Sequence, residues 1–265
     1  ETHIAYLSAE DNWWPSIEQM GPCGSDTEIF FWSDTKNPPP EFFDPSDDRW
    51  VEIWNNVFMQ FDHLDDGSFI ELKQKNVDTG MGVERTTAAL SGVDDNYRTE
   101  LWWPVICKIC ELCGKEYNAN TEKAMRIVAD HCRSVMMIAS DDAHITPSNT
   151  DQGYVLRRLI RRMLRYAKQL GIDINSDFDV EIVSVLSNIF GVYYPEVKDN
   201  FNYVKEALKT ERVKFAKTIE SGMKELNKDL SLLNGANELP AEQAFKLFDT
   251  FGFPIEMTME IASEQ

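Results

Sequence analysis

Residues 76–90 constrain the fold of this chain more than any other stretch, because a strand pattern, two glycines and a helix start follow one another there. Gly80 and Gly82 lie at the junction, where the missing Cβ atoms allow a ligand to approach the backbone closely. The helical pattern begins at Val83, and Arg85 places a cation near the positive end of the helix dipole. This arrangement is typical of a nucleotide-binding turn, although a Gly-x-Gly pair on spacing alone often only changes the direction of the chain.

The residue identities are more specific than the spacing. Residues 78–85, Asp-Thr-Gly-Met-Gly-Val-Glu-Arg, resemble the third signature motif of class II aminoacyl-tRNA synthetases in its alanyl form. Four further blocks resemble the same family, in the family's order: 11–14 (Asp-Asn-Trp-Trp) with 21–24 (Gly-Pro-Cys-Gly) and 28–29 (Glu-Ile); 52–61 (Glu-Ile-Trp-Asn-Asn-Val-Phe-Met-Gln-Phe); 126–131 (Arg-Ile-Val-Ala-Asp-His) with 147–149 (Pro-Ser-Asn) and 153–162; and 244–254. The five blocks span nearly the whole chain, which is therefore identified as similar to the alanyl-tRNA synthetase family.

The first hundred residues favour β-structure. Strand patterns occur at 27–32, 50–62 and 69–72, and a turn pattern at 65–68 separates the last two. Strands joined by a tight turn pair antiparallel. We therefore predict an α+β chain: an antiparallel, class II synthetase-type sheet with flanking helices over residues 1–100, and an all-helical, tRNA-recognising domain over residues 101–265.

The helices of residues 101–265 are predicted from apolar residues that recur every three or four positions. We expect helices at 101–113, from a cap at Thr121 onward, at 153–170, as one long amphipathic helix over 201–233 ended by Asn234 and Gly235, and from Leu239 to a break at 252–254. His131 beside Asp130 on one of these helices is interpreted as a structural hydrogen-bonding pair.

The charge balance limits the partners. A net charge of −19 argues against nonspecific coating of nucleic acid, and no apolar run approaches the length of a membrane span. We expect a cytoplasmic protein that binds neither DNA nor membranes.

The helix predicted at 153–170 is nevertheless basic. Its arginines lie largely opposite the apolar side formed by Leu156, Ile160 and Met163. Such a run is either a solvated face paired with the chain's many acids or a phosphate-binding surface. We predict tRNA contact for Arg157, Arg158, Arg161 and Arg162.

Three of the five cysteines, Cys107, Cys110 and Cys113, follow one another at a spacing of three. That spacing permits a metal or redox site, or simply the packing of small apolar side chains along one side of a helix. No histidine or fourth cysteine completes a nearby set, so we predict core packing and no metal held by these residues.

On the strand at 50–62, Asn55 shares a face with Ile53, Val57, Met59 and Phe61, because side chains alternate. A lone amide among apolar neighbours needs a hydrogen-bond partner, either within the protein or on a ligand.

The resemblance implies an alanine pocket built from Trp14, Asn55, Val57, Asp78 and Gly80. Asp78 would be the carboxylate that pairs with the substrate's ammonium group. The alternative is a helix-capping or turn aspartate.

The resemblance also implies an ATP site. Arg85, with Gly80 and Gly82, would hold the ATP phosphates, and Glu28 would contact ATP or Mg²⁺ unless it is only a surface residue. Arg85 and Asp78 are thus the candidate catalytic residues.

In the helical part, Asn149 and Asp249 match the family positions that recognise the G·U wobble pair of the tRNA(Ala) acceptor stem. An amide can donate and accept hydrogen bonds, and a carboxylate accepts one from an exocyclic amine. A helix cap for Asn149 and a turn position for Asp249 are the structural alternatives.

By resemblance, then, the activity is that of a ligase that activates alanine with ATP and transfers it to tRNA(Ala). The family's motifs 1 and 2 and its editing domain are missing from the printed sequence, and we expect the chain alone not to form the adenylate. A noncatalytic paralogue that binds tRNA or tRNA-like RNA, or an acidic helical scaffold, are the alternatives.

Overall fold

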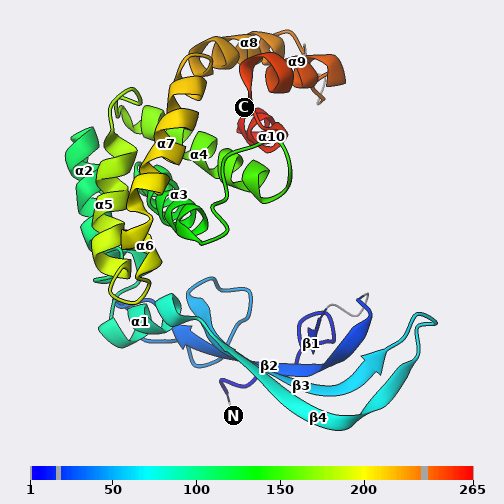
Figure 1. Cartoon of the computed structure of the whole chain (residues 1–265). Coiled ribbons are helices and arrows are strands. Elements are labelled where there is room, and N and C mark those ends of the chain that lie inside the picture. Colours follow the sequence, from blue (N-terminus) through cyan, green and yellow to red (C-terminus); the bar gives the residue numbers. More distant parts are fainter. Residues whose placement is uncertain (1, 16–18, 234–237, 265) are drawn as a thin grey trace. The chain divides into compact units, whose positions relative to one another are not determined.

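The computed structural model of this chain describes residues 2–15, 19–233 and 238–264. The chain divides into two compact units, Glu1–Glu100 and Leu101–Gln265 (Figure 1). The first unit contains the sheet and the second consists of helices, so the predicted α+β class is confirmed.

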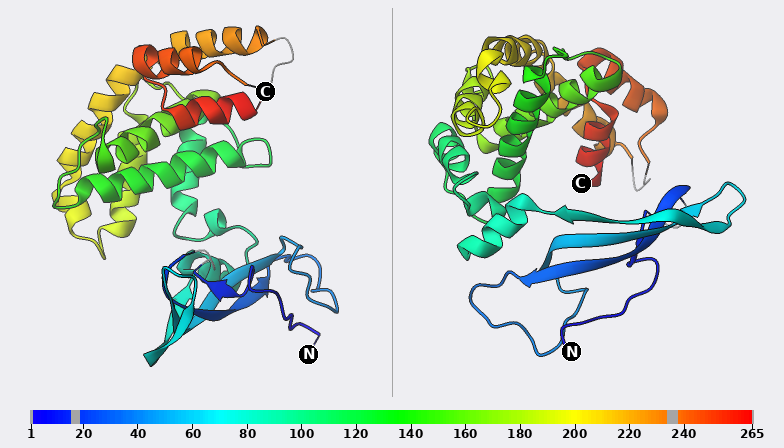
Figure 2. Two further views of the ribbon diagram at one scale, coloured as in Figure 1. Left: turned by 90° about the vertical axis from the view of Figure 1, so that its right-hand side faces the viewer. Right: turned by 60° about the horizontal axis from the view of Figure 1, so that its bottom comes forward.

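The first unit is built on one antiparallel sheet whose strands lie in chain order. Its strands are β1 (Trp13–Trp14), β2 (Gly21–Trp32), β3 (Trp50–His63) and β4 (Phe69–Met81), and β2, β3 and β4 run side by side in Figure 2. β4 is longer than predicted, because its pairing with β3 continues as far as Met81 opposite Trp54. Gly80 therefore lies inside the strand.

Helix α1 (Val83–Ser91) begins at the predicted residue, directly after β4, and Gly82 is its N-cap. A short 3₁₀ turn, η1 (Asn96–Arg98), closes the unit, with the Asp95 carboxylate accepting a hydrogen bond from the backbone of Tyr97.

The β2–β3 pairing contains an irregularity that matters for the site. Ile29 pairs with Trp54, but the next residue, Phe30, pairs with Glu52, so Ile53 is an extra residue in β3. Such a bulge interrupts the alternation of side chains between the two faces. Glu52, which strict alternation would place on the face opposite Asn55, instead accepts a hydrogen bond from the Asn55 amide.

The second unit packs around two central helices, which are rich in fully buried residues such as Met125, Val128, Leu156 and Ile160. Its helices are α2 (Trp103–Cys113), α3 (Glu122–Ser140), α4 (Asp151–Leu170), α5 (Phe178–Phe190), α6 (Glu196–Asp199), α7 (Phe201–Ala216), α8 (Ile219–Ser231), α9 (Ala241–Phe251) and α10 (Ile255–Ser263), with α3 and α4 at the centre.

The single long helix predicted for 201–233 is wrong. The chain forms α7 and α8, which are separated by Lys217 and Thr218, and the Thr218 hydroxyl donates hydrogen bonds to the carbonyls of Phe215 and Phe251. The predicted terminators Asn234 and Gly235 lie outside the described residues.

Helix α10 was not predicted. Gly252 ends α9 in the left-handed conformation, with φ of 70°, and Pro254 then serves as the N-cap of a further helix. Thr121 does occupy the N-cap position of α3, but its hydroxyl donates to the Glu116 carbonyl (2.6 Å) instead of accepting from the first turn.

The prediction that Cys107, Cys110 and Cys113 pack in the core is correct only in part. Cys132 is buried, Cys110 and Cys113 are half-buried, and Cys107 is exposed.

In the described parts of the chain, no three His, Cys, Asp or Glu residues form a group that could hold a metal ion. None of the described helices is both long and apolar enough to cross a bilayer.

Candidate functional site

In the first unit, the predicted small-molecule residues lie on two cross-strand rows of the sheet. Glu28 on β2 pairs with Asn55 on β3, which pairs with Gly80 on β4. Two residues along, Val57 pairs with Asp78. Residues two apart in a strand share a face, so these five positions lie on one face of the sheet.

At the first row, the Asn55 side chain lies over Gly80. A Cβ at Gly80 would lie 3.2 Å from Oδ1 of Asn55, so the amide extends over a position where only glycine gives full clearance. The Asn55 Nδ2 group donates to Oε1 of Glu52 at 3.3 Å. The side-chain oxygen of Asn55 is thereby directed away from Glu52.

The second row combines an apolar and an acidic residue. Val57 is only 4% exposed, whereas Asp78 is exposed. Asp78 lies within β4, four residues before the N-cap Gly82, so neither the capping nor the turn alternative describes it. An exposed carboxylate beside a buried apolar side chain can accept hydrogen bonds from a cation above the sheet.

Arg85 contacts Glu52, the same residue that accepts a hydrogen bond from Asn55 on this face. Its Nη1 donates to the Glu52 carbonyl at 3.0 Å and to Oε2 of the Glu52 carboxylate at 3.3 Å. The Arg85 side chain is still 50% exposed. Glu52 therefore links Asn55 with Arg85. No role for Glu52 was predicted, because strict alternation places it on the other face, and only its position three residues before Asn55 in the family-like block could have suggested one.

Acidic groups gather on the same face. Burial raises the pKa of Glu28, and the nearby charges of Glu52 and Asp26 raise it further. Burial likewise raises the pKa of Asp26, and one oxygen of that carboxylate is buried without a hydrogen-bond partner. Mg²⁺ commonly takes one or two protein carboxylates and fills its remaining positions with phosphate and water. This donor set fits such an ion, when phosphates supply the other ligands.

Trp14 lies further from these residues. It pairs with Gly24 across β1 and β2 and is 46% exposed. β1 lies beyond β2, and so is separated from β3 by one intervening strand. The neighbouring Trp13 stacks on Phe61 of β3, with ring centroids 6.0 Å apart. The sheet thus brings Asn55, Val57, Asp78 and Gly80 together, while no described contact joins Trp14 to them.

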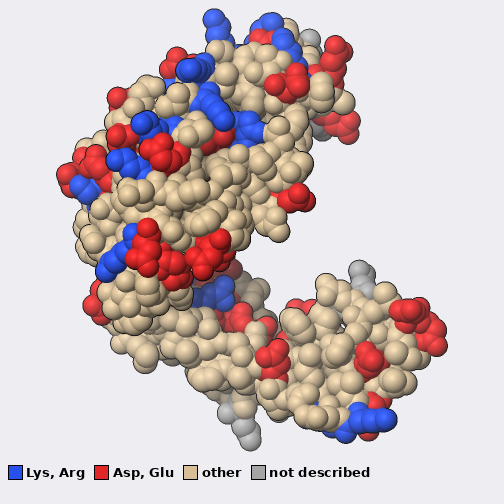
Figure 3. All heavy atoms as spheres, viewed as in Figure 1, with Lys and Arg blue, Asp and Glu red and all other residues tan. Residues whose placement is uncertain are grey.

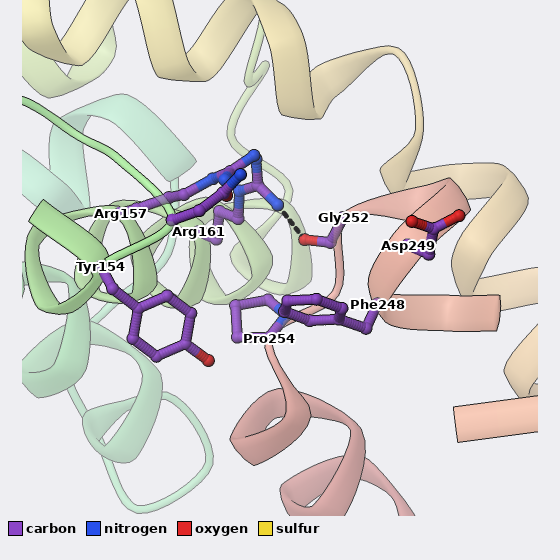
Figure 4. Close-up of a pocket in the computed structure, with 8 residues that line it drawn as sticks. Tyr154, Arg157, Arg161, Phe248, Asp249, Gly252 and Pro254 are labelled. Atoms are coloured by element: carbon purple, nitrogen blue, oxygen red, sulfur yellow. Dashed lines mark hydrogen bonds between the residues drawn. The ribbon is translucent and has the colours of Figure 1, made fainter. Parts of the chain in front are cut away.

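In the second unit, Asn149 and Asp249 line one pocket of about 140 Å³, although they are far apart in the sequence. Asn149 lies in the loop before α4, where Thr150 is the N-cap, so Asn149 does not cap the helix. Asp249 lies in the last turn of α9, three residues before Gly252. Tyr154, Arg157, Arg161, Phe248, Gly252 and Pro254 complete the lining, as Figure 4 shows.

The arginines of α4 are paired with glutamates. Arg158 donates to Glu256 of α10 at 2.8 Å, and Arg162 to Glu260 at 2.5 Å. Arg157 donates to Glu211 of α7 at 3.2 Å. All three arginines are only partly buried, and on the face of the helical unit seen in Figure 3 the basic and acidic side chains are intermingled. Pairing with the chain's own acids therefore accounts for much of this basic run.

Arg161 differs from the other three arginines predicted to contact tRNA. It is 5% exposed, and burial lowers its pKa while the nearby carboxylate of Glu211 opposes that shift. A guanidinium so enclosed has little surface to offer a phosphate in this conformation.

His131 also has a structural role, as predicted. Its Nδ1 lies 3.0 Å from the Asp130 carboxylate, and its Nε2 lies 2.9 Å from Nη1 of Arg162. Because Arg162 can only donate, Nε2 is the acceptor in this contact.

The chain is similar to known tRNA synthetases over its whole length. A family model described as tRNA synthetases class II (A) matches residues 1–265. The alanine–tRNA ligase of Borrelia hermsii is 42% identical over 98% of this chain and 44% of its own length. Those of Treponema pallidum and Halalkalibacterium halodurans are 41% and 40% identical, over 99% and 98% of this chain. The chain thus spans 30% to 44% of the length of these relatives.

Proposed function

The chain belongs to the class II tRNA synthetases of the alanine type, and on that premise we propose that it forms part of the catalytic core and the tRNA-recognising domain of an alanine–tRNA ligase. Such an enzyme condenses alanine with ATP to alanyl-adenylate, releasing pyrophosphate, and then transfers the alanyl group to the 3′ end of tRNA(Ala). We expect the reaction to take place in the cytoplasm.

Alanine binds, in this proposal, on the sheet face formed by the two cross-strand rows. The observation that carries it is the register that sets Asn55 against Gly80 and Val57 against Asp78. The Asp78 carboxylate pairs with the substrate's ammonium group and the Asn55 amide oxygen accepts a further hydrogen bond. The buried Val57 limits the space for the substrate side chain, and Trp14 is assigned to the pocket only by the family resemblance.

ATP binds beside alanine, with Arg85 on its phosphates. Arg85 is half exposed and paired only with Glu52 among the contacts described, so a phosphate can compete for its guanidinium. Gly80 and Gly82 allow the nucleotide to approach the backbone. Glu28, with Asp26, is the candidate for contact with Mg²⁺, which supplies neutralisation of the phosphate charge when it is bound.

The helical unit recognises the acceptor stem of tRNA(Ala) through Asn149 and Asp249. Their presence in one pocket supports this assignment. The pocket offers an amide and a carboxylate to the exposed base edges of a G·U pair. Arg157 lines the pocket, and Arg158 and Arg162 lie on the same helix, α4; the partly exposed guanidinium groups of these three are the ones we assign to the RNA backbone.

The test is alanine-dependent exchange of pyrophosphate into ATP, measured on the full-length protein that contains this chain. We expect exchange with alanine and, in a second assay, faster charging of an RNA with a G·U pair than of one with G·C. Absence of exchange together with retained RNA binding would favour a noncatalytic RNA-binding paralogue. That alternative is supported only by the fact that the Asn149–Asp249 pocket needs no residue of the first unit.

A further inference from the structure

Arg161 connects three elements of the helical unit at one point. Its Nε donates to Oε1 of Glu211 on α7 at 2.6 Å, and Nη2 lies 2.5 Å from the same oxygen. Nη1 donates to the carbonyl of Gly252, in the turn between α9 and α10 (Figure 4). The guanidinium also lies 5.0 Å from the ring centroid of Phe215. Both sides of the arginine fork are therefore occupied by protein groups.

The α9–α10 turn is fitted to this arginine. Gly252 has φ of 70°, and a Cβ there would overlap Nη1 of Arg161, so both the backbone conformation and the arginine require glycine. Beside it, the Thr218 hydroxyl donates to the Phe251 carbonyl at 2.8 Å. Phe253 is fully buried, and a Cβ at Gly222 would overlap its ring. The turn therefore has few alternative conformations while Arg161 keeps these contacts.

This turn determines where Asp249 lies. Asp249 is in the last turn of α9, three residues before Gly252, while Asn149 lies in the loop that leads into α4, the helix that carries Arg161. The bond from Arg161 to Gly252 therefore ties α4 directly to the end of α9. Any shift of that end would change the separation of Asn149 and Asp249 across their pocket.

We propose that Arg161 is a positioning residue, which sets Asp249 opposite Asn149 for recognition of the wobble pair and does not itself contact the RNA backbone. This inference rests on the proposed function of the Asn149–Asp249 pocket. It replaces the direct tRNA contact that the sequence predicted for Arg161.

The decisive variant is Arg161→Lys in the full-length protein, because lysine keeps the charge but cannot reach Glu211 and Gly252 together. Binding of two acceptor-stem RNA hairpins, one with G·U and one with G·C, is measured over a range of salt concentrations. We expect the preference for G·U to fall about tenfold, as when one base contact is lost, with an unchanged dependence of log Kd on log salt. The salt dependence is decided by a second variant, Arg161→Gln, which removes the charge: loss of a phosphate contact would lower that slope by about 0.9 and weaken both hairpins equally, whereas a positioning role leaves the slope unchanged.

The matched control is Arg212→Lys. Arg212 is another buried arginine, paired with Asp177 and Asp179, and it does not line the pocket. We expect it to lower thermal stability and leave the G·U preference intact. If Arg161→Lys fails to fold, Gly252→Ala displaces the turn from the other side with the arginine present, and it should lose the same preference.

The outcomes separate the two hypotheses. A retained G·U preference in Arg161→Lys and Gly252→Ala overturns the positioning role, and a lower salt slope in Arg161→Gln would show that Arg161 contacts phosphate after all. If the unmodified protein shows no G·U preference, the proposed recognition function itself fails, and the positioning role fails with it.

Discussion

The two arginines Arg85 and Arg161 show how differently the same side chain is used in the two units. Arg85 is half exposed and its described partners are a carbonyl and a carboxylate of one residue, Glu52, at 3.0 and 3.3 Å. Arg161 is almost fully buried and shared between Glu211 and Gly252. An exposed guanidinium can exchange its carboxylate for a ligand phosphate, but a buried one cannot do so without leaving a buried charge unpaired. We infer that the sheet unit presents its charged side chains to ligands, whereas the helical unit uses the buried Arg161 to shape its pocket.

The largest effect that tests this contrast is expected at Asp78. Asp78→Asn removes a charge from an exposed strand position, so folding should be nearly unaffected, while kcat/KM for alanine in pyrophosphate exchange should fall at least about 100-fold, or about 3 kcal/mol. Glu71→Gln, which removes an exposed carboxylate from the same strand outside the two rows, is the control. Equal exchange activity in both variants would remove Asp78 from the alanine site.

The second test concerns a carboxylate that the helical unit buries. Burial raises the pKa of Asp179 from its ordinary 3.8 to about 6, although Arg212 lies 3.4 Å away and opposes the shift. Because the folded pKa exceeds that of the unfolded chain, the protonated form stabilises the fold at low pH, and this contribution is lost as pH rises through about 6. Urea unfolding between pH 4 and 7 should show a loss of about 2 kcal/mol that Asp179→Asn lacks.

Asp177 is the matched control for that pH profile. It is exposed, and its hydrogen bond with Arg212 lowers its pKa, so its contribution is present at neutral pH and lost on acidification. The profile of Asp177→Asn should therefore differ from that of the unmodified protein in the opposite direction. Profiles that change alike in the two variants would show that burial of Asp179 does not control the titration.

The pattern of success and failure in predicting the fold from sequence has a physical basis. Local signals worked in part: alternation located β3 and parts of β2 and β4 but not β1, and the glycine-to-helix transition located the start of α1 at Val83. The separation of α7 from α8 was missed because the apolar period continues through Thr218, and the break involves a hydrogen bond to Phe251, which lies 33 residues away. Periodicity carries no information about such a partner.

In the candidate site, too, local relations could be predicted and contacts between distant residues could not. Residues of one strand, such as Asn55 and Val57, could be grouped from alternation, whereas Gly80 was grouped with them only through the family resemblance. The place of Glu52 depends on a bulge, and the burial of Arg161 depends on Glu211 and Gly252, which lie 50 and 91 residues further along the chain. The direct contacts of Asn149 and Asp249 with RNA stay predictions.

A smaller effect, about tenfold, is expected for Asn149→Ala or Asp249→Ala. Either change should slow charging of RNA that carries a G·U pair and leave alanine-dependent exchange unaltered, because the pocket lies wholly in the helical unit. Charging and exchange are measured on the same preparation. If both activities fell together, the separation of tasks between the two units would be wrong.

The smallest effects distinguish the alanine and ATP parts of the sheet unit. In Gly80→Ala the new Cβ would lie 3.2 Å from Oδ1 of Asn55, and in Gly82→Ala it would lie 3.3 Å from Cδ of Arg85. Each neighbour can yield by a few tenths of an ångström, so we expect changes of only about threefold to fivefold, on the order of 1 kcal/mol. Gly80→Ala should raise KM for alanine more than KM for ATP, and Gly82→Ala should do the reverse. Steady-state exchange kinetics with each substrate varied in turn measure both constants, and the same ratio in both variants would mean that Asn55 and Arg85 do not serve different substrates.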